Sequence, residues 1–80
     1  MKIVDYKIDV SSIRKMMVDM HINTISELSK RSGINRNTLS DVLNGKTRPS
    51  SDTMYKLVDC LAIPPSKAGE IFFNDNLLNA

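Results

Sequence analysis

Hydrophobic residues recur along much of this 80-residue chain at the three- and four-residue spacing of amphipathic helices. Two stripes follow the i, i+3, i+4, i+7 pattern. They are Ile13, Met16, Met17 and Met20 in the first, and Met54, Leu57, Val58 and Leu61 in the second. We expect one helix around each stripe, the first capped by Ser11 or Ser12 and the second by Ser50 or Ser51.

The first ten residues follow a different pattern, in which apolar and polar side chains alternate. Val4, Tyr6, Ile8 and Val10 share one phase, which predicts a strand over 1–10. A lone strand needs a partner for its backbone groups. We place that partner near 71–73, a segment compatible with either a helix end or a strand.

The segment 24–43 predicts two short helices joined by a tight turn. Thr24 is suited to cap the first helix, and Glu27 to reach back to the cap amide. Gly33 permits the left-handed backbone of a sharp turn, and Asn35 caps the next helix. Ile34 and Leu39 are expected to anchor the turn and the second helix in the core. This arrangement is the helix-turn-helix unit, whose second helix fits the DNA major groove.

The glycine and proline residues after this unit indicate where the other helices begin and end. Together these elements form an all-α domain over 1–80. Gly45 would end the helix before it, and 46–49 would form an extended loop. Pro64-Pro65 would stop the next helix and open a short fifth one. We therefore expect a strand-like arm at 1–10, four core helices within 11–63, and a short helix or strand with a tail at 64–80.

Charge is distributed unevenly. The segment 30–48 holds five basic residues and one acid, a net charge of +4, whereas the rest of the chain carries −2. A basic face toward a polyanion explains this distribution, although a solvated surface with clustered charges explains it as well.

Other functions find little support in the sequence. No apolar run approaches the length of about 20 residues that spans a bilayer, and the N-terminus has no signal-peptide pattern. The single cysteine, Cys60, fits a reducing cytoplasm and has no partner histidine in sequence. His21 lacks the further ligands of a zinc site. Gly45-Lys46-Thr47 lacks the earlier glycine of a phosphate-binding loop. We expect no enzyme activity, no cofactor, no metal, no small-molecule ligand and no membrane partner.

From Ile13 to Ile63 the chain resembles the Cro/cI-type (Xre-like) helix-turn-helix repressors of phages and bacteria. The resemblance rests on ELS at 27–29, GINRNTLS at 33–40, NGK at 44–46 and RPS at 48–50. It implies a five-helix, lambda-repressor-like DNA-binding domain that acts as a homodimer on a palindromic operator.

The resemblance also implies which residues contact DNA. Base contacts fall to Arg36, Asn37, Ser40 and Asp41, and contacts to the DNA backbone fall to Thr24, Thr38, Asn44, Lys46 and Arg48. Arginine pairs with guanine and asparagine with adenine through two hydrogen bonds each. Alternatives stay open: Arg36 as a phosphate contact, Asn37 as a polar helix start, Thr38 as a thymine-methyl contact, and Asp41 in a salt bridge with Arg36 or Lys46. Lys30 and Arg31 are weaker phosphate candidates.

The chain departs from the family pattern at two places. Ile25 stands where a glutamine usually follows the cap of the first helix of the motif, which puts one phosphate contact in doubt. Val18 and Leu43 stand where some members bury an arginine–glutamate pair. Apolar residues replace such a pair without loss of stability, so we expect a Val18–Leu43 contact.

The sequence thus predicts a cytoplasmic, nucleoid-associated, Cro-like repressor that occludes its operator. We expect no sensor domain within these eighty residues, so occupancy would follow protein concentration. The dimer contact is expected at apolar residues near the two ends, unless these only cover the core of one chain: Tyr6, Ile8, Ile71, Phe72 and Phe73. The alternative function is a protein-interaction module, an antitoxin or an adaptor.

Overall fold

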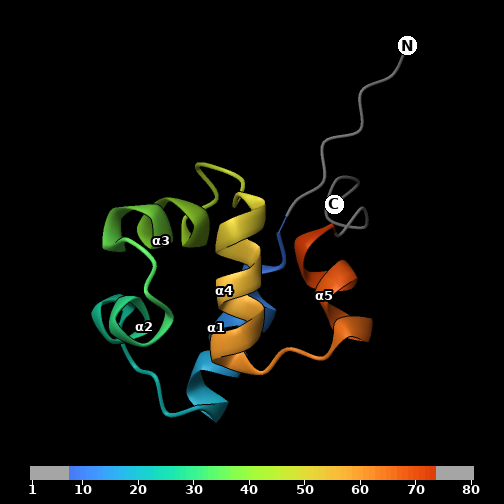
Figure 1. Ribbon diagram of the computed structural model, residues 1–80, viewed down its shortest axis with the longest axis horizontal. Helices are drawn as coiled ribbons and strands as arrows, with labels where there is room; N and C mark the ends of the chain where they lie inside the picture. Colours follow the sequence, from blue (N-terminus) through green and yellow to red (C-terminus); the bar gives the residue numbers. More distant parts are fainter. Residues whose placement is uncertain (1–7, 74–80) are drawn as a thin grey trace.

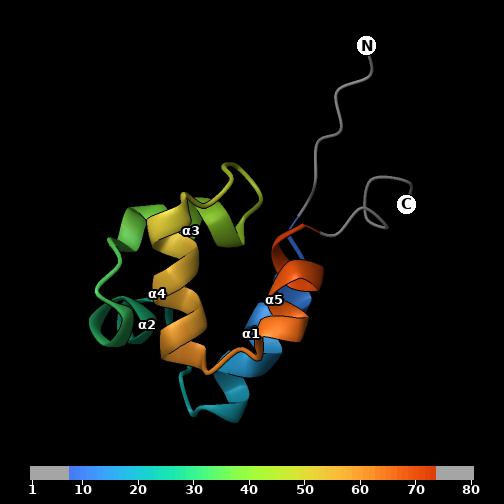
Figure 2. The same ribbon diagram turned by 45° about the vertical axis from the view of Figure 1, so that its right-hand side comes forward.

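The computed structural model describes residues 8–73, which form five α-helices and no strand. The helices are α1 (Val10–Asp19), α2 (Ile25–Ser32), α3 (Arg36–Leu43), α4 (Ser51–Leu61) and α5 (Pro65–Phe72). Helix α4 lies centrally, with α2 and α3 on one side of it and α5 on the other (Figure 1). Turning the molecule shows α5 alongside α1 (Figure 2). The predicted all-α fold is confirmed for this part of the chain.

Three helices begin where the sequence places their caps. The Thr24 hydroxyl accepts a 3.1 Å hydrogen bond from the Glu27 amide at the start of α2. The Asn35 side chain does the same at α3 and Ser50 at α4. Each cap satisfies an amide that has no partner inside its helix, and each contributes about 1 kcal/mol. Helix α5 begins instead with Pro65 in its first turn, as predicted.

Helix α1 begins earlier than the sequence predicted. Its cap is Asp9, whose carboxylate accepts one hydrogen bond from the Ser12 amide at 3.2 Å and one from the Ser12 hydroxyl at 2.6 Å. The prediction of Ser11 or Ser12 as the cap is therefore wrong. Aspartate caps as well as serine does, and its charge also favours the positive end of the helix dipole.

The earlier start of α1 limits the predicted N-terminal strand. Val10 lies in the helix, so the alternating pattern does not continue as a strand to the end of 1–10. Residues 1–7 lie outside the described part of the chain. One backbone hydrogen bond, from the Asp9 amide to the Ile71 carbonyl at 2.7 Å, joins the start of α1 to α5. Of the two structures considered for 71–73, Ile71 and Phe72 form a helix end.

Two helices end on residues other than glycine in the left-handed region. His21 (φ 60°) follows α1 and Ala62 (φ 53°) follows α4. The Ile22 amide then bonds to the Met17 carbonyl, and the Ile63 amide to the Val58 carbonyl. These are the bonds that commonly satisfy helix C-terminal carbonyls. Helix α4 therefore stops at Leu61, before the proline pair that was predicted to stop it.

One hydrophobic core joins all five helices. Ile13 and Met17 come from α1, and Leu28, Leu39 and Leu57 come from the three helices that follow. The other buried members are Ile22, Ile34, Leu43, Leu61, Ile63, Ile71 and Phe72. The stripes predicted from the sequence thus face inward, except that Met20 is 37% exposed.

The predicted Val18–Leu43 contact is wrong. Val18 is 65% exposed, whereas Leu43 is buried in the core. Val18 lies one position beyond Met17 on α1, and this rotation carries its side chain off the buried stripe. Leu43 packs among the core residues instead.

Candidate nucleic-acid interface

Helices α2 and α3 are joined by a turn that begins at Gly33. Gly33 has φ 76°, a conformation that costs residues with a Cβ atom about 1–2 kcal/mol. Its amide bonds to the Ser29 carbonyl at 2.9 Å, which closes the end of α2. The prediction of a left-handed glycine turn between the two helices is confirmed.

Two serine hydroxyls hold the turn. The Ser29 hydroxyl donates a 2.6 Å hydrogen bond to the Ile34 carbonyl, and the Ser32 hydroxyl accepts one from the Ile34 amide at 3.2 Å. Ile34 itself is buried. Both its backbone groups and its side chain are therefore held, directly before Asn35 caps α3. The hydrogen bond of the Ser29 hydroxyl was not predicted from the sequence.

Helix α3 divides into a buried and an exposed face. Leu39 and Val42 have no exposed surface, and Leu43 is also buried. Arg36, Asn37 and Thr38 are exposed at the N-terminal end of the helix. The core thus holds α3 by one face and leaves three polar side chains at the end where the helix dipole is positive.

Ser40 and Asp41, the other predicted base contacts, are half-buried. The Ser40 hydroxyl accepts a 3.3 Å hydrogen bond from the side-chain amide of Asn44, one turn later. The Asp41 carbonyl accepts a 2.8 Å bond from the Lys46 amide, so it fixes the loop through its backbone. Within the described part of the chain, the Asp41 carboxylate forms no ion pair with Arg36 or Lys46, the alternative considered for it.

The loop from α3 to α4 carries the predicted phosphate contacts. Gly45 has φ 73° and ends α3 as predicted, and Pro49 is buried against the body of the domain. Between them Lys46 and Arg48 are exposed. The loop therefore places basic side chains beyond the C-terminal end of α3, while Arg36 lies at the other end of that helix.

The start of α2 offers Thr24, which is exposed and whose hydroxyl already caps the helix. Ile25, which stands where related sequences usually have glutamine, is half-buried and packs against the core. An apolar side chain offers phosphate no hydrogen bond. Ile25 therefore cannot make the phosphate contact that a glutamine would make at this position.

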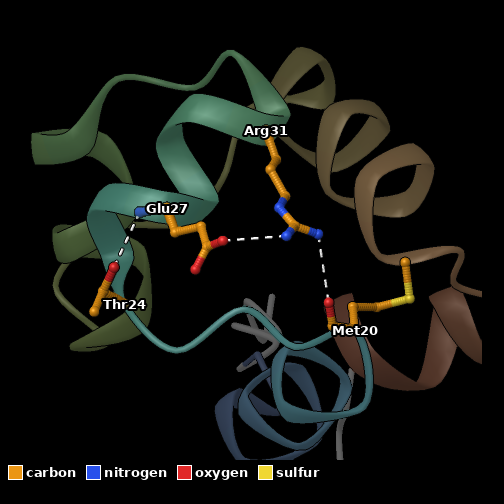
Figure 3. Close-up of polar contacts among 4 residues, drawn as sticks. All are labelled: Met20, Thr24, Glu27 and Arg31. Atoms are coloured by element: carbon orange, nitrogen blue, oxygen red, sulfur yellow. Dashed lines mark hydrogen bonds and ion pairs between the residues drawn. The ribbon is translucent and has the colours of Figure 1, made fainter.

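Arg31 braces α2 against the end of α1 (Figure 3). Its guanidinium lies 3.1 Å from the Glu27 carboxylate and 3.4 Å from the Met20 carbonyl. Glu27 thus pairs with Arg31 and does not reach back to the amide of Thr24, so that half of the predicted capping arrangement is wrong. The i, i+4 spacing of Glu27 and Arg31 was a readable signal for this pair.

The residues predicted for a dimer contact differ in exposure where the structure describes them. Ile71 and Phe72 are each only 3% exposed and belong to the core of a single chain. Ile8 is half-buried against the same core, whereas Phe73 is 48% exposed. Tyr6 lies outside the described residues. For Ile71 and Phe72, the alternative that they cover one chain's core fits the structure better than a dimer contact.

The described residues contain few groups suited to other chemistry. Among residues 8–73, no three histidine, cysteine or acidic side chains gather as a metal site, and no helix has the length and apolar character needed to cross a membrane. Cys60 is half-buried on α4. Burial raises the pKa of its thiol above the ordinary value, against an opposing effect of Arg31.

Comparison with known protein families agrees with this geometry. The sequence model of one family, described as a Cro/C1-type HTH DNA-binding domain, matches residues 12–67, which is more than half of the chain. Comparisons with curated proteins and with solved structures found no significant match. The match includes the α2–turn–α3 unit and the basic loop. The chain therefore belongs to the Cro/C1-type helix-turn-helix family of DNA-binding domains.

Proposed function

We propose that this DNA-binding regulator is a Cro-like repressor that binds a palindromic operator as a homodimer. The observation that carries the proposal is the division of α3. Its inner face is locked in the core by Leu39 and Val42, while Arg36 and Asn37 are exposed directly after the turn. A helix held in this way can enter the major groove without rearrangement of the domain.

Base recognition is assigned to four residues of α3. Arg36 and Asn37 carry the side chains that pair with guanine and adenine through two hydrogen bonds. Ser40 and Asp41 lie further along the helix and are half-buried, which suits contacts at the edge of the same site. A carboxylate at Asp41 would accept a hydrogen bond from a cytosine amine.

Backbone contacts are assigned to residues on both sides of α3. Thr24 and Thr38 are exposed near helix N-termini, where backbone amides favour phosphate. Lys46 and Arg48 supply positive charge from the loop, and Asn44 an exposed amide beside it. Each phosphate contact should steepen the salt dependence of binding by about one unit of slope.

Repression would follow from occlusion of the operator. Two subunits would insert their α3 helices into successive major grooves, about 34 Å apart, and exclude polymerase from the site. The proposal places the protein in the cytoplasm, bound to the nucleoid, with DNA as its partner and with no catalytic step, cofactor or small-molecule ligand.

The test begins with selection of duplex DNA from a randomised pool, followed by fluorescence anisotropy across a salt series. We expect a two-fold symmetric sequence bound at least about a thousandfold more tightly than scrambled DNA. Arg36→Ala should lose about 1–3 kcal/mol of discrimination at one base pair of each half-site. Arg14→Ala is the matched control, because Arg14 is exposed on α1 outside the proposed interface.

Lys46→Ala should weaken binding to all sequences equally and reduce the salt slope by about one. Weak binding that is equal on selected and scrambled DNA would contradict the proposal and favour the second function, a protein-interaction module. A selected sequence without two-fold symmetry would contradict the palindromic operator, whereas the DNA-binding function would stand.

A further inference from the structure

An apolar groove of about 270 Å³ lies between α4 and α5. Among the described residues, its lining carries no charged side chain, and its apolar members are Met54, Tyr55, Val58, Ala68, Phe72 and Phe73. Tyr55 is 75% exposed and Phe73 is 48% exposed, so two aromatic rings lie at the surface beside half-buried apolar groups. Aromatic residues and methionine are enriched at the centres of protein interfaces, where charged residues are depleted.

Another cleft among the described residues, of about 940 Å³, has a different character. It lies between α1 and α5, and charged side chains of both signs line it: Lys15, Asp19, Lys67 and Glu70 among them. Charged groups at an open surface remain hydrated and gain little from being covered. The α4–α5 groove is therefore the surface that gains more from burial.

We propose that the α4–α5 groove is occupied by a second copy of this chain, with Tyr55 of each copy inserted into the groove of the other. The inference rests on the homodimer of the proposed function and assigns its contact surface. A two-fold contact brings one patch against itself, so that patch must be self-complementary. Here a projecting ring and an apolar groove share one face, so each copy supplies what the other lacks.

The charges beside the groove are compatible with this pairing. Next to Tyr55 on α4, Lys56 lies 3.0 Å from Asp52, and the two form an i, i+4 ion pair. This pair has no net charge, so two copies meeting there would not repel each other through it. DNA phosphate, in contrast, would meet no cation among the residues of 8–73 that line the groove.

The groove is also continuous with the candidate DNA interface. Ser51 and Tyr55 of its lining lie in the first turns of α4, directly after the loop that carries Lys46 and Arg48. A second copy seated on the groove would bring its own loop to the same end of the molecule. With the two-fold axis running along the groove toward this end, the two recognition helices would face the same side, which a palindromic operator requires.

This assignment changes the dimer residues expected from the sequence. Ile71 and Phe72 contribute to the core of one chain, so the contact moves to Tyr55 and Phe73, the exposed aromatic residues of the groove. Tyr55 was missed because it lies off the apolar stripe of α4.

The first test is sedimentation equilibrium of the wild-type chain and of Tyr55→Lys over a wide concentration range. We expect a wild-type dimer and a rise of about thirtyfold or more in the dimer dissociation constant of the variant. The control is Val18→Lys, because Val18 is another exposed apolar residue, 65% exposed on α1, and its variant should dimerise normally. Unchanged circular dichroism would show that both variants fold.

Measurements of DNA binding distinguish a failure of this inference from a failure of the proposed function. On a duplex holding one half of the selected palindrome, Tyr55→Lys should bind as tightly as the wild type. On the full palindrome it should lose the gain that the wild type obtains from two subunits. Arg36→Ala should show the reverse pattern, a loss on both duplexes with normal dimerisation.

Three results would overturn the inference. A Tyr55→Lys variant that remains as dimeric as the wild type would place the contact elsewhere, although the homodimer would stand. A wild-type chain that is monomeric both alone and on DNA would remove the dimer, whatever the Arg36→Ala result. Methyl NMR spectra of the wild type offer a check without mutation. The Met54 and Val58 methyl signals should shift on dilution, and constant signals across a dimer–monomer transition would also refute the assignment.

Discussion

The hydroxyl of Ser29 donates a 2.6 Å hydrogen bond to the carbonyl oxygen of Ile34, across the turn of the helix-turn-helix unit. The bond joins the middle of α2 to the last residue before the cap of α3. It is short and partly buried, so water competes with it only weakly. The angle at which α3 leaves the turn is therefore set partly by a hydrogen bond as well as by packing.

Ser29→Ala should lower the free energy of unfolding by about 1 kcal/mol, because the Ile34 carbonyl loses its partner in a partly buried place. The measurement is urea unfolding monitored by circular dichroism. Ser26→Ala, at an exposed position of the same helix, is the control and should change stability by less than about 0.5 kcal/mol. Equal losses of stability from the two variants would show that the Ser29 hydroxyl stabilises the domain no more than an exposed serine hydroxyl does.

The cap of α1 can be tested directly. Asp9→Ala should destabilise the domain by about 1 kcal/mol, because the Ser12 amide and hydroxyl both lose their acceptor. Ser11→Ala should have little effect, since Ser11 is exposed inside the helix. Thermal unfolding of the two variants distinguishes the residues, and a larger loss at Ser11 would contradict the observed cap.

Two glycines should respond to alanine in opposite directions. Gly33→Ala should cost about 1–2 kcal/mol, because Gly33 adopts φ 76°. Gly69 lies inside α5, where an added Cβ would meet nothing within 4 Å. Gly69→Ala should therefore stabilise the domain by about 0.5–1 kcal/mol through helix propensity. Denaturant midpoints measure both effects, and stabilisation by Gly33→Ala would refute the left-handed turn.

We expect Arg31 to stabilise the fold rather than to contact DNA phosphate. Its guanidinium is already engaged by Glu27 and by the Met20 carbonyl (Figure 3). Arg31→Ala should leave the salt slope of DNA binding unchanged, whereas Lys46→Ala should reduce that slope by about one. The loss of stability should stay below about 1 kcal/mol, because the ion pair is exposed. A reduced slope for Arg31→Ala would assign this residue to the DNA backbone.

The thiol of Cys60 should titrate above the ordinary cysteine range, because burial raises its pKa. The folded chain then holds this proton more tightly than the unfolded chain does. The resulting stabilisation is complete below the unfolded pKa and is lost as pH rises through the folded pKa. Alkylation by iodoacetamide, followed by mass spectrometry, should rise at higher pH in the folded chain than in urea. Arg31→Ala should move the folded profile higher still, because Arg31 lowers this pKa.

Much of the helix-turn-helix unit could be predicted because its signals are local. Thr24, Gly33 and Asn35 act on backbone groups within a few residues of themselves, so spacing alone identified the caps and the turn. Contacts between distant segments had no such signal. The bond from Asp9 to Ile71 and the contact of Arg31 with Met20 depend on how α1 meets α5 and α2.

The wrong predictions also concern packing between segments that lie far apart in the sequence. Val18 was placed in the core by analogy with a buried pair, and the rotation of α1 about its axis exposes it. Ile71 and Phe72 were placed at a dimer contact because they are apolar and near the end of the chain. Apolar character predicts burial but does not say which surface provides it.

By itself, the sequence determined the helices, the left-handed turn at Gly33 and the polar residues on α3, because each depends on propensity, capping or periodicity along a few residues. Only the tertiary structure decided which apolar residues fill the core and which, like Tyr55 and Phe73 at the α4–α5 groove, remain exposed. That division depends on the packing of helices far apart in sequence, where rotating a helix by one residue turns a side chain by about 100°.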